Sequence, residues 1–342
     1  MHLAKPVTAR PVIVLAAALA ATALTACSSS SGHGSGGSDA ATVTLRIPDP
    51  GNSGVLALGK KDGSLDKALA AVHAKVAWTG SAGPFAPAAQ ELNAGQLDVA
   101  QGSITSAVTA LAAKPGFKLF AATEPDPVGE GILVKDGSPI ASVKDLVGKK
   151  VAVNQGGTGE YLLLRALAEA GISPDQVQRV YLRPDQSAPV FNSGQVDAWA
   201  TWSSYAVSAL ADSGAHFLAN GKALGSDNYS VWAVRTAFAE QHPEATRALY
   251  QYLHDNDAKA KADPAGYLNV FTEAGPQAVT GKKKEISIDF GRQAGVDQPI
   301  DEAVAARFDR VAAFYAAQQI TKDQVAVKPN LLDVNSLPGG TR

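Results

Sequence analysis

Apolar and polar positions follow two alternating periods from about residue 42 onward. Short apolar runs, T-V-T-L-R-I, K-V-A-W-T and F-K-L-F-A-A, predict strands at 42–47, 75–79 and 117–122. Between them, apolar residues recur every three or four positions and predict helices at 65–72 and 85–92. Strands that alternate with helices in this way predict an α/β fold with a mostly parallel sheet.

A second series of strands and helices begins near residue 131. Its predicted strands are 131–135, 151–153 and 180–182, and its first predicted helix covers 161–170. The run S-V-W-A-V then returns the chain to the first series at 230–234. We therefore expect two lobes with a cleft between them, joined by two hinge strands near residues 132 and 232.

One short segment occurs twice, as L-N-A-G-Q-L-D-V-A at 92–100 and as F-N-S-G-Q-V-D-A-W at 191–199. The shared pattern is apolar-Asn-x-Gly-Gln-apolar-Asp. Gly95 and Gly194 are predicted to end a helix in the left-handed conformation. Asp98 and Asp197 are interpreted as turn residues that open the next strand, not as acids. The repeat predicts that each lobe carries the same helix-to-strand unit.

The first 26 residues have the pattern of an export signal. Lys5 and Arg10 form a basic start, and residues 11–26 are apolar or small, too few for the roughly 20 that a membrane-spanning helix needs. Cys27 follows directly, and L-T-A-C resembles the bacterial lipobox, whose cysteine receives a lipid. The Ser- and Gly-rich segment after it is a flexible tether. We therefore expect a soluble domain that a lipid on Cys27 holds to the membrane surface.

These patterns divide the chain into predicted parts. The parts are a signal peptide at 1–26, a lipidated linker at 27–41, a first lobe made of 42–132 and 232–330, a second lobe at 133–231, and a C-terminal tail at 331–342.

Composition and charge exclude several classes of function. The chain of 342 residues is 46% hydrophobic and 18% charged, as in globular proteins, and its net charge is −2. Without a basic stripe, a nucleic-acid partner is not expected. Cys27 is the only cysteine, and the histidines lack metal-ligand spacing, so we expect no disulfide, no metal and no cofactor.

Four predicted loops that lead from a strand into a helix carry small or hydroxylated residues, at 50–54, 80–84, 101–106 and 154–161. In open α/β sheets, ligands bind at such loops, where backbone N–H groups and helix N-termini meet. The sequence therefore predicts an anion site, although Gly and Ser are also ordinary turn residues. Its candidate donors are Asn52, Ser53, Ser81, Gly102, Ser103, Gly157 and Thr158.

Motifs of enzymes are missing from the sequence. It has no H-E-x-x-H, no G-x-S-x-G and no phosphate-binding G-K-[ST]. A cleft-based lyase or synthase on the same scaffold would need a general base, and Glu160 is the only candidate in the four loops. We expect a binding protein, not an enzyme; a sensory or adhesive surface lipoprotein is a third hypothesis.

Several motifs together resemble one family. S-P-I-A-S-V-K-D-L-V-G-K-K-V-A-V-N, G-G-T-G-E-Y-L-L-L-R-A-L-A-E-A-G and V-D-A-W-A-T-W-S-S-Y resemble the solute-binding lipoproteins of ABC importers, in the branch for aliphatic sulfonates, taurine, nitrate and thiamine precursors. The likeness covers roughly residues 43–325. It implies a two-lobed periplasmic-binding-protein type II fold and a monomer outside the cytoplasm. It also implies that the protein closes over a small anion and delivers it to a permease with its ATPase.

Carried over by position, the resemblance implies a set of ligand-binding residues. Alternation along the strand puts Trp199 and Trp202 on opposite faces, and we expect Trp199 in the core and Trp202, at the strand end, in the cleft. The implied ligand-binding residues are Asn52, Ser53, Ala82, Gly83, Gly102, Ser103, Gly157, Thr158, Tyr161 and Trp202.

The chain departs from the family pattern at two positions. Ser103 stands where members often have the acid of T-G-D, and Ser203 stands where they often have the acid of W-D-P-Y. Such an acid can pair with a cationic amine, so its loss argues against taurine. An aliphatic sulfonate without an amine is the expected ligand, and nitrate and a thiamine precursor are the alternatives.

Overall fold

The computed structural model describes residues 42–113, 115–124 and 127–339. The predicted signal peptide and the whole predicted linker, with Cys27, lie outside the described residues. Residues 41–342 form one compact unit. Among the residues that the structure describes, none of the helices combines the length and the apolar character that crossing a membrane requires.

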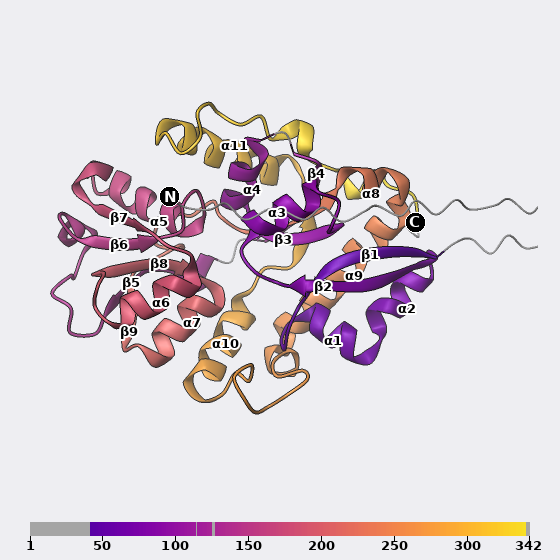
Figure 1. Cartoon of the computed structure of the whole chain (residues 1–342), viewed down its shortest axis with the longest axis horizontal. Coiled ribbons are helices and arrows are strands. Elements are labelled where there is room, and N and C mark those ends of the chain that lie inside the picture. The colour runs from indigo at the N-terminus through magenta and orange to yellow at the C-terminus, as the bar shows by residue number, and fades with distance from the viewer. Residues whose placement is uncertain (1–41, 114, 125–126, 340–342) are drawn as a thin grey trace, which may run out of the picture. The chain divides into compact units, whose positions relative to one another are not determined.

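The strands lie in three sheets (Figure 1). A parallel pair consists of β1 (Val43–Asp49) and β2 (Ala74–Ser81). A four-stranded sheet has the order β11 (Asp297–Pro299), β4 (Phe117–Thr123), β10 (Ser230–Arg235), β3 (Val99–Ser103). A five-stranded sheet has the order β7 (Gln178–Tyr181), β6 (Lys150–Val153), β8 (Ala198–Trp202), β5 (Glu130–Lys135), β9 (Ala215–Asn220).

Helices cover these sheets (Figure 1). Those before β5 are α1 (Val55–Asp62), α2 (Ser64–Ala70), α3 (Phe85–Asn93) and α4 (Ile104–Leu111). Those beside the five-stranded sheet are α5 (Thr158–Glu169), α6 (Pro184–Asn192) and α7 (Ser203–Asp212). The later ones are α8 (Thr236–Gln241), α9 (Pro243–Ala262), α10 (Gly281–Gln293) and α11 (Glu302–Ala317). Short 3-10 turns are η1 (Pro127–Gly129), η2 (Val143–Leu146), η3 (Pro174–Gln176), η4 (Pro264–Tyr267), η5 (Lys328–Asn330) and η6 (Val334–Ser336).

The predicted two-lobed α/β fold is confirmed, but the pairing inside the two larger sheets is mixed. Both β5 and β10 enter their sheets after the chain has crossed from the other lobe. In the five-stranded sheet, β5 runs antiparallel to β8 and β9, while β6 is parallel to β7 and β8. In the four-stranded sheet, β10 runs antiparallel to β3 and β4. A strand that arrives from the other lobe lacks the crossover helix that parallel pairing requires.

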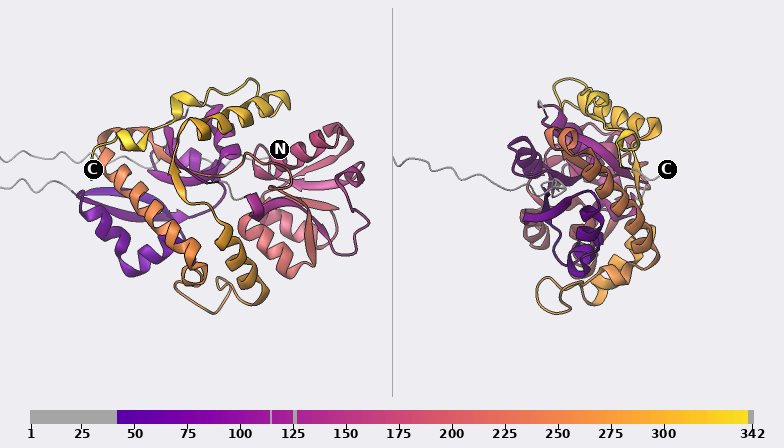
Figure 2. Two further views of the ribbon diagram at one scale, coloured as in Figure 1. Left: turned by 180° about the vertical axis from the view of Figure 1, so that it is seen from behind. Right: turned by 90° about the vertical axis from the view of Figure 1, so that its right-hand side faces the viewer.

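Apolar residues pack into three clusters of buried side chains. One joins the four-stranded sheet, α4, α5 and α11, and a second lies between the β1–β2 pair, α2 and α9. Seen from behind in Figure 2, α9 in orange crosses this indigo layer. The third cluster, around Trp199, lies in the five-stranded sheet with α6 and α7. The C-terminal segment, predicted as a tail, packs on the first and second clusters: Leu332 N donates to Leu119 O at 2.8 Å, and Val334 is fully buried.

The two copies of the repeated segment adopt the same structure. Gly95 (φ 69°) and Gly194 (φ 74°) end α3 and α6 in the left-handed conformation, as predicted. In each copy the aspartate then accepts a hydrogen bond from a backbone N–H of another strand. Asp98 Oδ2 accepts from Arg46 N at 2.9 Å, and Asp197 Oδ2 accepts from Lys150 N at 2.8 Å.

Asp98 opens β3 as predicted, but its side chain also forms ion pairs that the sequence analysis did not predict. Its carboxylate is 1% exposed and lies between the guanidinium groups of Arg46 (Nη2–Oδ1 2.8 Å) and Arg235 (Nη2–Oδ1 2.7 Å). Burial alone would raise the pKa of Asp98, but the hydrogen bonds from Arg46 and Arg235 lower this pKa below its ordinary value. Asp98 therefore joins β1 to the end of β10, which the spacing of the repeat could not show.

Replacing Asp98 with Ala should destabilise the protein by about 3 kcal/mol, because it leaves two arginines without their buried partner. The matched control is Asp197→Ala. This exposed copy holds one backbone N–H, and its loss should cost about 1 kcal/mol or less. Urea denaturation at pH 7 measures both. Since the folded-state pKa of Asp98 is depressed, its contribution is present above the unfolded pKa of 3.8 and is lost as pH falls below that value. Equal losses for the two variants would contradict this role.

Candidate ligand-binding site

The N-termini of α4 and α5, which belong to different lobes, lie next to each other. Ser103 caps the N-terminus of α4, where its hydroxyl and that of Ser106 form a capping box. Gly157 precedes α5, which has no side-chain cap. The hydroxyl oxygens of Ser103 and Thr158 lie 3.2 Å apart across the junction. Since helix N-termini carry partial positive charge, their meeting point is suited to an anion. On α4 the backbone N–H groups of Ile104, Thr105 and Ser106 already donate within the protein, so this helix contributes its dipole and its hydroxyls.

Two of the predicted glycines allow close packing around this junction. A Cβ on Gly102 would lie 2.6 Å from the ring of Phe85, and a Cβ on Gly157 would lie 1.8 Å from Asn154 Nδ2. Asn154 Oδ1 in turn accepts from Gly159 N at 2.8 Å and so fixes the first turn of α5. Any side chain at Gly157 would therefore displace the residue that orders the start of this helix.

Behind the junction lies a buried polar network that the sequence analysis missed. Asn228, on the return crossing between β9 and β10, bonds to Thr105 of α4, to Thr158 of α5 and to Glu130 at the start of β5. Ser226 Oγ donates to Glu130 Oε1 at 2.6 Å. The available signal was Glu130 itself, an acid directly before the apolar run G-I-L-V.

The two tryptophans of β8 differ in burial. Trp199 is 3% exposed and packs against Phe191 (ring centroids 5.9 Å apart), so its predicted core position is confirmed. Trp202 is half-buried at the strand end, with its ring centroid 5.8 Å from that of Tyr205. It pairs with Glu130 across the ladder, at the edge of the polar network. That Trp202 faces a ligand stays a prediction.

The ligand-binding residues predicted in the first lobe differ in burial. Asn52 is buried, and its amide holds the loop after η4: Nδ2 donates to Thr272 O at 2.8 Å and Oδ1 accepts from Phe271 N at 2.8 Å. Ser53 is half-buried beside it. Ser81, at the end of β2, is exposed, as are Ala82 and Gly83 after it. The structure shows no contact from these residues to the α4–α5 junction.

Tyr161 is buried on α5 and packs against α11. Its ring lies edge-on to those of Phe314 and Tyr315, with centroids 5.5 and 6.1 Å away. The phenol oxygen accepts from Asp227 N at 3.2 Å, and burial raises the pKa of Tyr161 to about 12. The contacts of this side chain are thus with the protein interior, and its role toward a ligand is untested.

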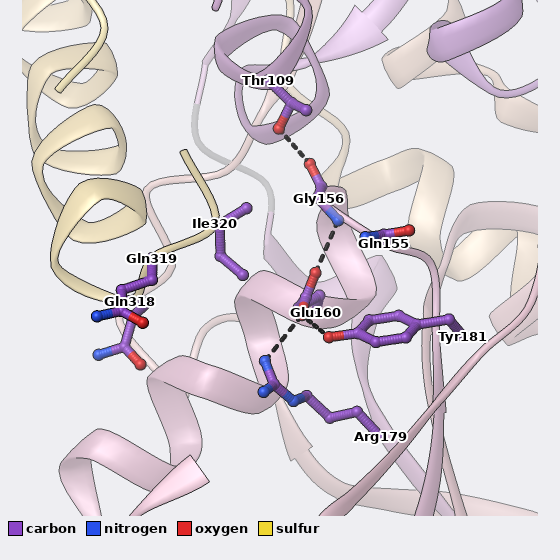
Figure 3. A pocket seen from close by; sticks show the side chains of 9 residues that line it. All are labelled: Thr109, Gln155, Gly156, Glu160, Arg179, Tyr181, Gln318, Gln319 and Ile320. Atoms are coloured by element: carbon purple, nitrogen blue, oxygen red, sulfur yellow. Dashed lines mark hydrogen bonds and ion pairs between the residues drawn. The ribbon is translucent and has the colours of Figure 1, made fainter. Parts of the chain in front are cut away.

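A separate polar cavity of about 490 Å³ lies beside the start of α5 (Figure 3). Glu160 is fully buried in its wall and accepts from Gly156 N (2.7 Å), Arg179 Nη1 (3.0 Å) and Tyr181 Oη (2.7 Å). Burial and the bond to Glu160 raise the pKa of Tyr181 to about 12. The other lining residues are Thr109, Gln155, Gln318, Gln319 and Ile320. The one acid that the enzyme hypothesis could use is thus already occupied by three donors.

No group of three or more His, Cys, Asp or Glu side chains in the described part of the chain could hold a metal ion.

The chain is similar to a family and to solved structures. Residues 82–266 match the family model described as "NMT1/THI5 like". The alkanesulfonate-binding protein SsuA from Xanthomonas axonopodis pv. citri, bound to MOPS, is 27% identical with a TM-score of 0.75, over 86% of this chain and 99% of that one. The periplasmic aliphatic sulphonate binding protein SsuA from Escherichia coli is 27% identical with a TM-score of 0.74, over 87% and 95%.

An enzyme also shares this fold. The desulfurization enzyme DSZB is 18% identical with a TM-score of 0.61, over 86% of this chain and 98% of that one. At this identity the likeness concerns the fold alone, so it carries no catalytic role to this chain.

The burial of the two tryptophans predicts unequal effects on stability. Trp199→Ala should lower the free energy of unfolding by about 3–5 kcal/mol, because it opens a cavity between β8, α6 and α7. Trp202→Ala should cost clearly less, because its half-buried ring leaves less packing to lose. Urea denaturation followed by circular dichroism measures both variants. A larger loss for Trp202→Ala would show that the core assignment is inverted.

Proposed function

The chain belongs to the NMT1/THI5-like family, and on this premise we propose that it is the extracytoplasmic solute-binding protein of an ABC importer. It captures a small anion at the junction of α4 and α5 and delivers it to a permease with its ATPase. The observation that carries the proposal is the meeting of two helix N-termini from different lobes, with the hydroxyls of Ser103 and Thr158 3.2 Å apart. An anion there attracts both lobes and so favours closure.

The proposed ligand is an aliphatic sulfonate. Two SsuA proteins that share the fold along almost their whole length support it. The distribution of acidic side chains also supports a sulfonate without an amine. Ser103 and Ser203 stand where family members often have acids, and both oxygens of the neighbouring Glu130 already accept hydrogen bonds from Ser226 and Asn228. A ligand amine would find no carboxylate at these two serines, which favours a sulfonate with an uncharged tail.

Within this proposal, Trp202 provides the apolar wall for the ligand's tail. Its half-buried ring stands at the end of β8, next to the start of β5. The opposite wall is formed, when the lobes close, by the predicted residues of the first lobe: Asn52, Ser53, Ser81, Ala82 and Gly83. Asn52 acts indirectly in this account, by ordering the loop that contains Phe271, which is 48% exposed.

Binding should raise the melting temperature, because only the folded protein presents both helix N-termini. At a concentration of 100 times the dissociation constant, the gain is about 2.7 kcal/mol. We would measure it with ethanesulfonate, MOPS, taurine, sulfate, nitrate and a thiamine precursor. The expected order places ethanesulfonate above taurine. A shift for nitrate or the thiamine precursor alone would replace the sulfonate assignment, and no shift for any of them would remove the anion-binding function.

We also propose the lipid anchor, the monomeric state and the residue bounds given above for the two lobes. The lipobox L-T-A-C and the tether after it support attachment through Cys27 at the outer face of the membrane.

Replacing Cys27 with Ala should abolish the membrane attachment, because this single residue carries the lipid. Cell fractionation should then find the protein released, or retained as an unprocessed precursor of higher mass. Ser29→Ala, two residues further on, is the matched control and should remain attached. A processed Cys27→Ala protein that stays in the membrane fraction would contradict the lipobox interpretation.

A further inference from the structure

The side-chain amide of Asn228 connects the two helix N-termini. The side chain is 4% exposed and uses its full hydrogen-bonding capacity. Its Oδ1 accepts from Thr105 N at 3.0 Å and from Thr105 Oγ1 at 2.8 Å, both on α4. Its Nδ2 donates to Glu130 Oε2 at 2.7 Å and to Thr158 Oγ1 at 3.2 Å. One residue on the return crossing thus holds α4, α5 and the start of β5 together.

The orientation of this amide follows from chemistry, although the oxygen and nitrogen of an amide are easily interchanged. The backbone N–H of Thr105 can only donate, so the atom that faces it must be the oxygen. The nitrogen therefore faces Glu130 and Thr158. A carboxyl oxygen of Glu130 on that side accepts one of its two hydrogens, which holds the amide in the same orientation.

This orientation decides the direction of the Thr158 hydroxyl. Because Thr158 Oγ1 accepts from Asn228, its own hydrogen points to another partner. The remaining partners are the oxygens of Thr105 and Ser103 at 3.3 and 3.2 Å, both at the start of α4. The hydrogen of Thr105 is itself given to Asn228. Thr158 is therefore a donor toward the junction before any ligand arrives.

We propose that Asn228 and Glu130 are positioning residues that set the Thr158 hydroxyl as a hydrogen-bond donor for the bound anion. This inference rests on the proposed function. A hydroxyl can present either a hydrogen or a lone pair, and a sulfonate oxygen accepts hydrogens only. The hydrogen bonds from Glu130 through Asn228 to Thr158 form a relay that orients the Thr158 hydroxyl before the anion binds. Binding therefore does not have to reorient this donor.

An isosteric exchange tests the relay. In Asn228→Asp with Glu130→Gln, the amide and the acid trade places and the net charge is unchanged. The amide introduced at position 130 would donate to the carboxylate introduced at position 228. That carboxylate would still accept from Thr105, so the melting temperature should be close to that of the wild type. Asn228→Asp alone sets two carboxyl groups 2.7 Å apart and should melt at a lower temperature. In the double variant, Thr158 would donate into the new carboxylate and present a lone pair to the ligand.

Calorimetric titration with ethanesulfonate should show that the double variant binds about ten- to a hundredfold more weakly than the wild type, the effect of losing a hydrogen bond to a charged group. A purely structural role would instead restore affinity together with the melting temperature. Wild-type affinity in the double variant would thus overturn the inference while leaving the proposed function intact. A wild-type protein that binds no anion in the screen would overturn both.

Thr158→Val tests whether the hydroxyl itself donates to the ligand, as distinct from an effect of the moved charge. In the wild-type background this test does not depend on the stability of the double variant. It should weaken ethanesulfonate binding about tenfold or more in the wild type, whereas Thr158→Ser, which keeps the hydroxyl, should bind within about twofold. Added to the double variant, Thr158→Val should change affinity little, because the hydroxyl there no longer donates to the ligand. Equal losses in both backgrounds would overturn the relay.

Discussion

The contact between Ser103 and Thr158 depends on a constraint of topology. Their helices follow strands of different sheets, and the chain crosses between those sheets twice, once outward into β5 and once back into β10. Each crossing places a polar side chain beside the junction, Glu130 on the outward crossing and Asn228 on the return. Burying these groups would be costly without partners, and hydrogen bonds to each other, to Ser226 and to the first residues of both helices offset that cost. The proposed binding site and the two crossings are thus parts of one hydrogen-bonded network.

This arrangement also explains how an acid can lie near an anion site. The Glu130 carboxyl group is 7% exposed, and Ser226 and Asn228 donate to its two oxygens. It therefore acts on the junction through the orientation of Asn228. Within the proposed function, discrimination against a ligand amine follows from the serines at 103 and 203, where the resembling family often has acids. Glu130 has a different role there, because it orders the proposed site through Asn228.

Local sequence patterns predicted those parts of the structure that depend on neighbouring residues. The alternation of short apolar runs and amphipathic segments predicted most strands and helices, and the repeat predicted the left-handed glycines at 95 and 194. These local patterns could not predict contacts between segments that are distant in the sequence. Nothing near Asp98 indicates that Arg46 and Arg235, 52 and 137 residues away, meet there. Asn228 was missed for the same reason, since its partners come from three separate segments.

A crystal structure with bound ethanesulfonate would show where the anion binds. We expect sulfonate oxygens about 2.7–3.2 Å from Thr158 Oγ1 and from a backbone N–H group in the first turn of α5, with the ethyl group toward Trp202. The amide of Asn228 should keep its contacts with Thr105 and Glu130. Ligand bound only in the cavity beside Glu160 and Arg179, with the junction of the two helices unchanged, would contradict this expectation.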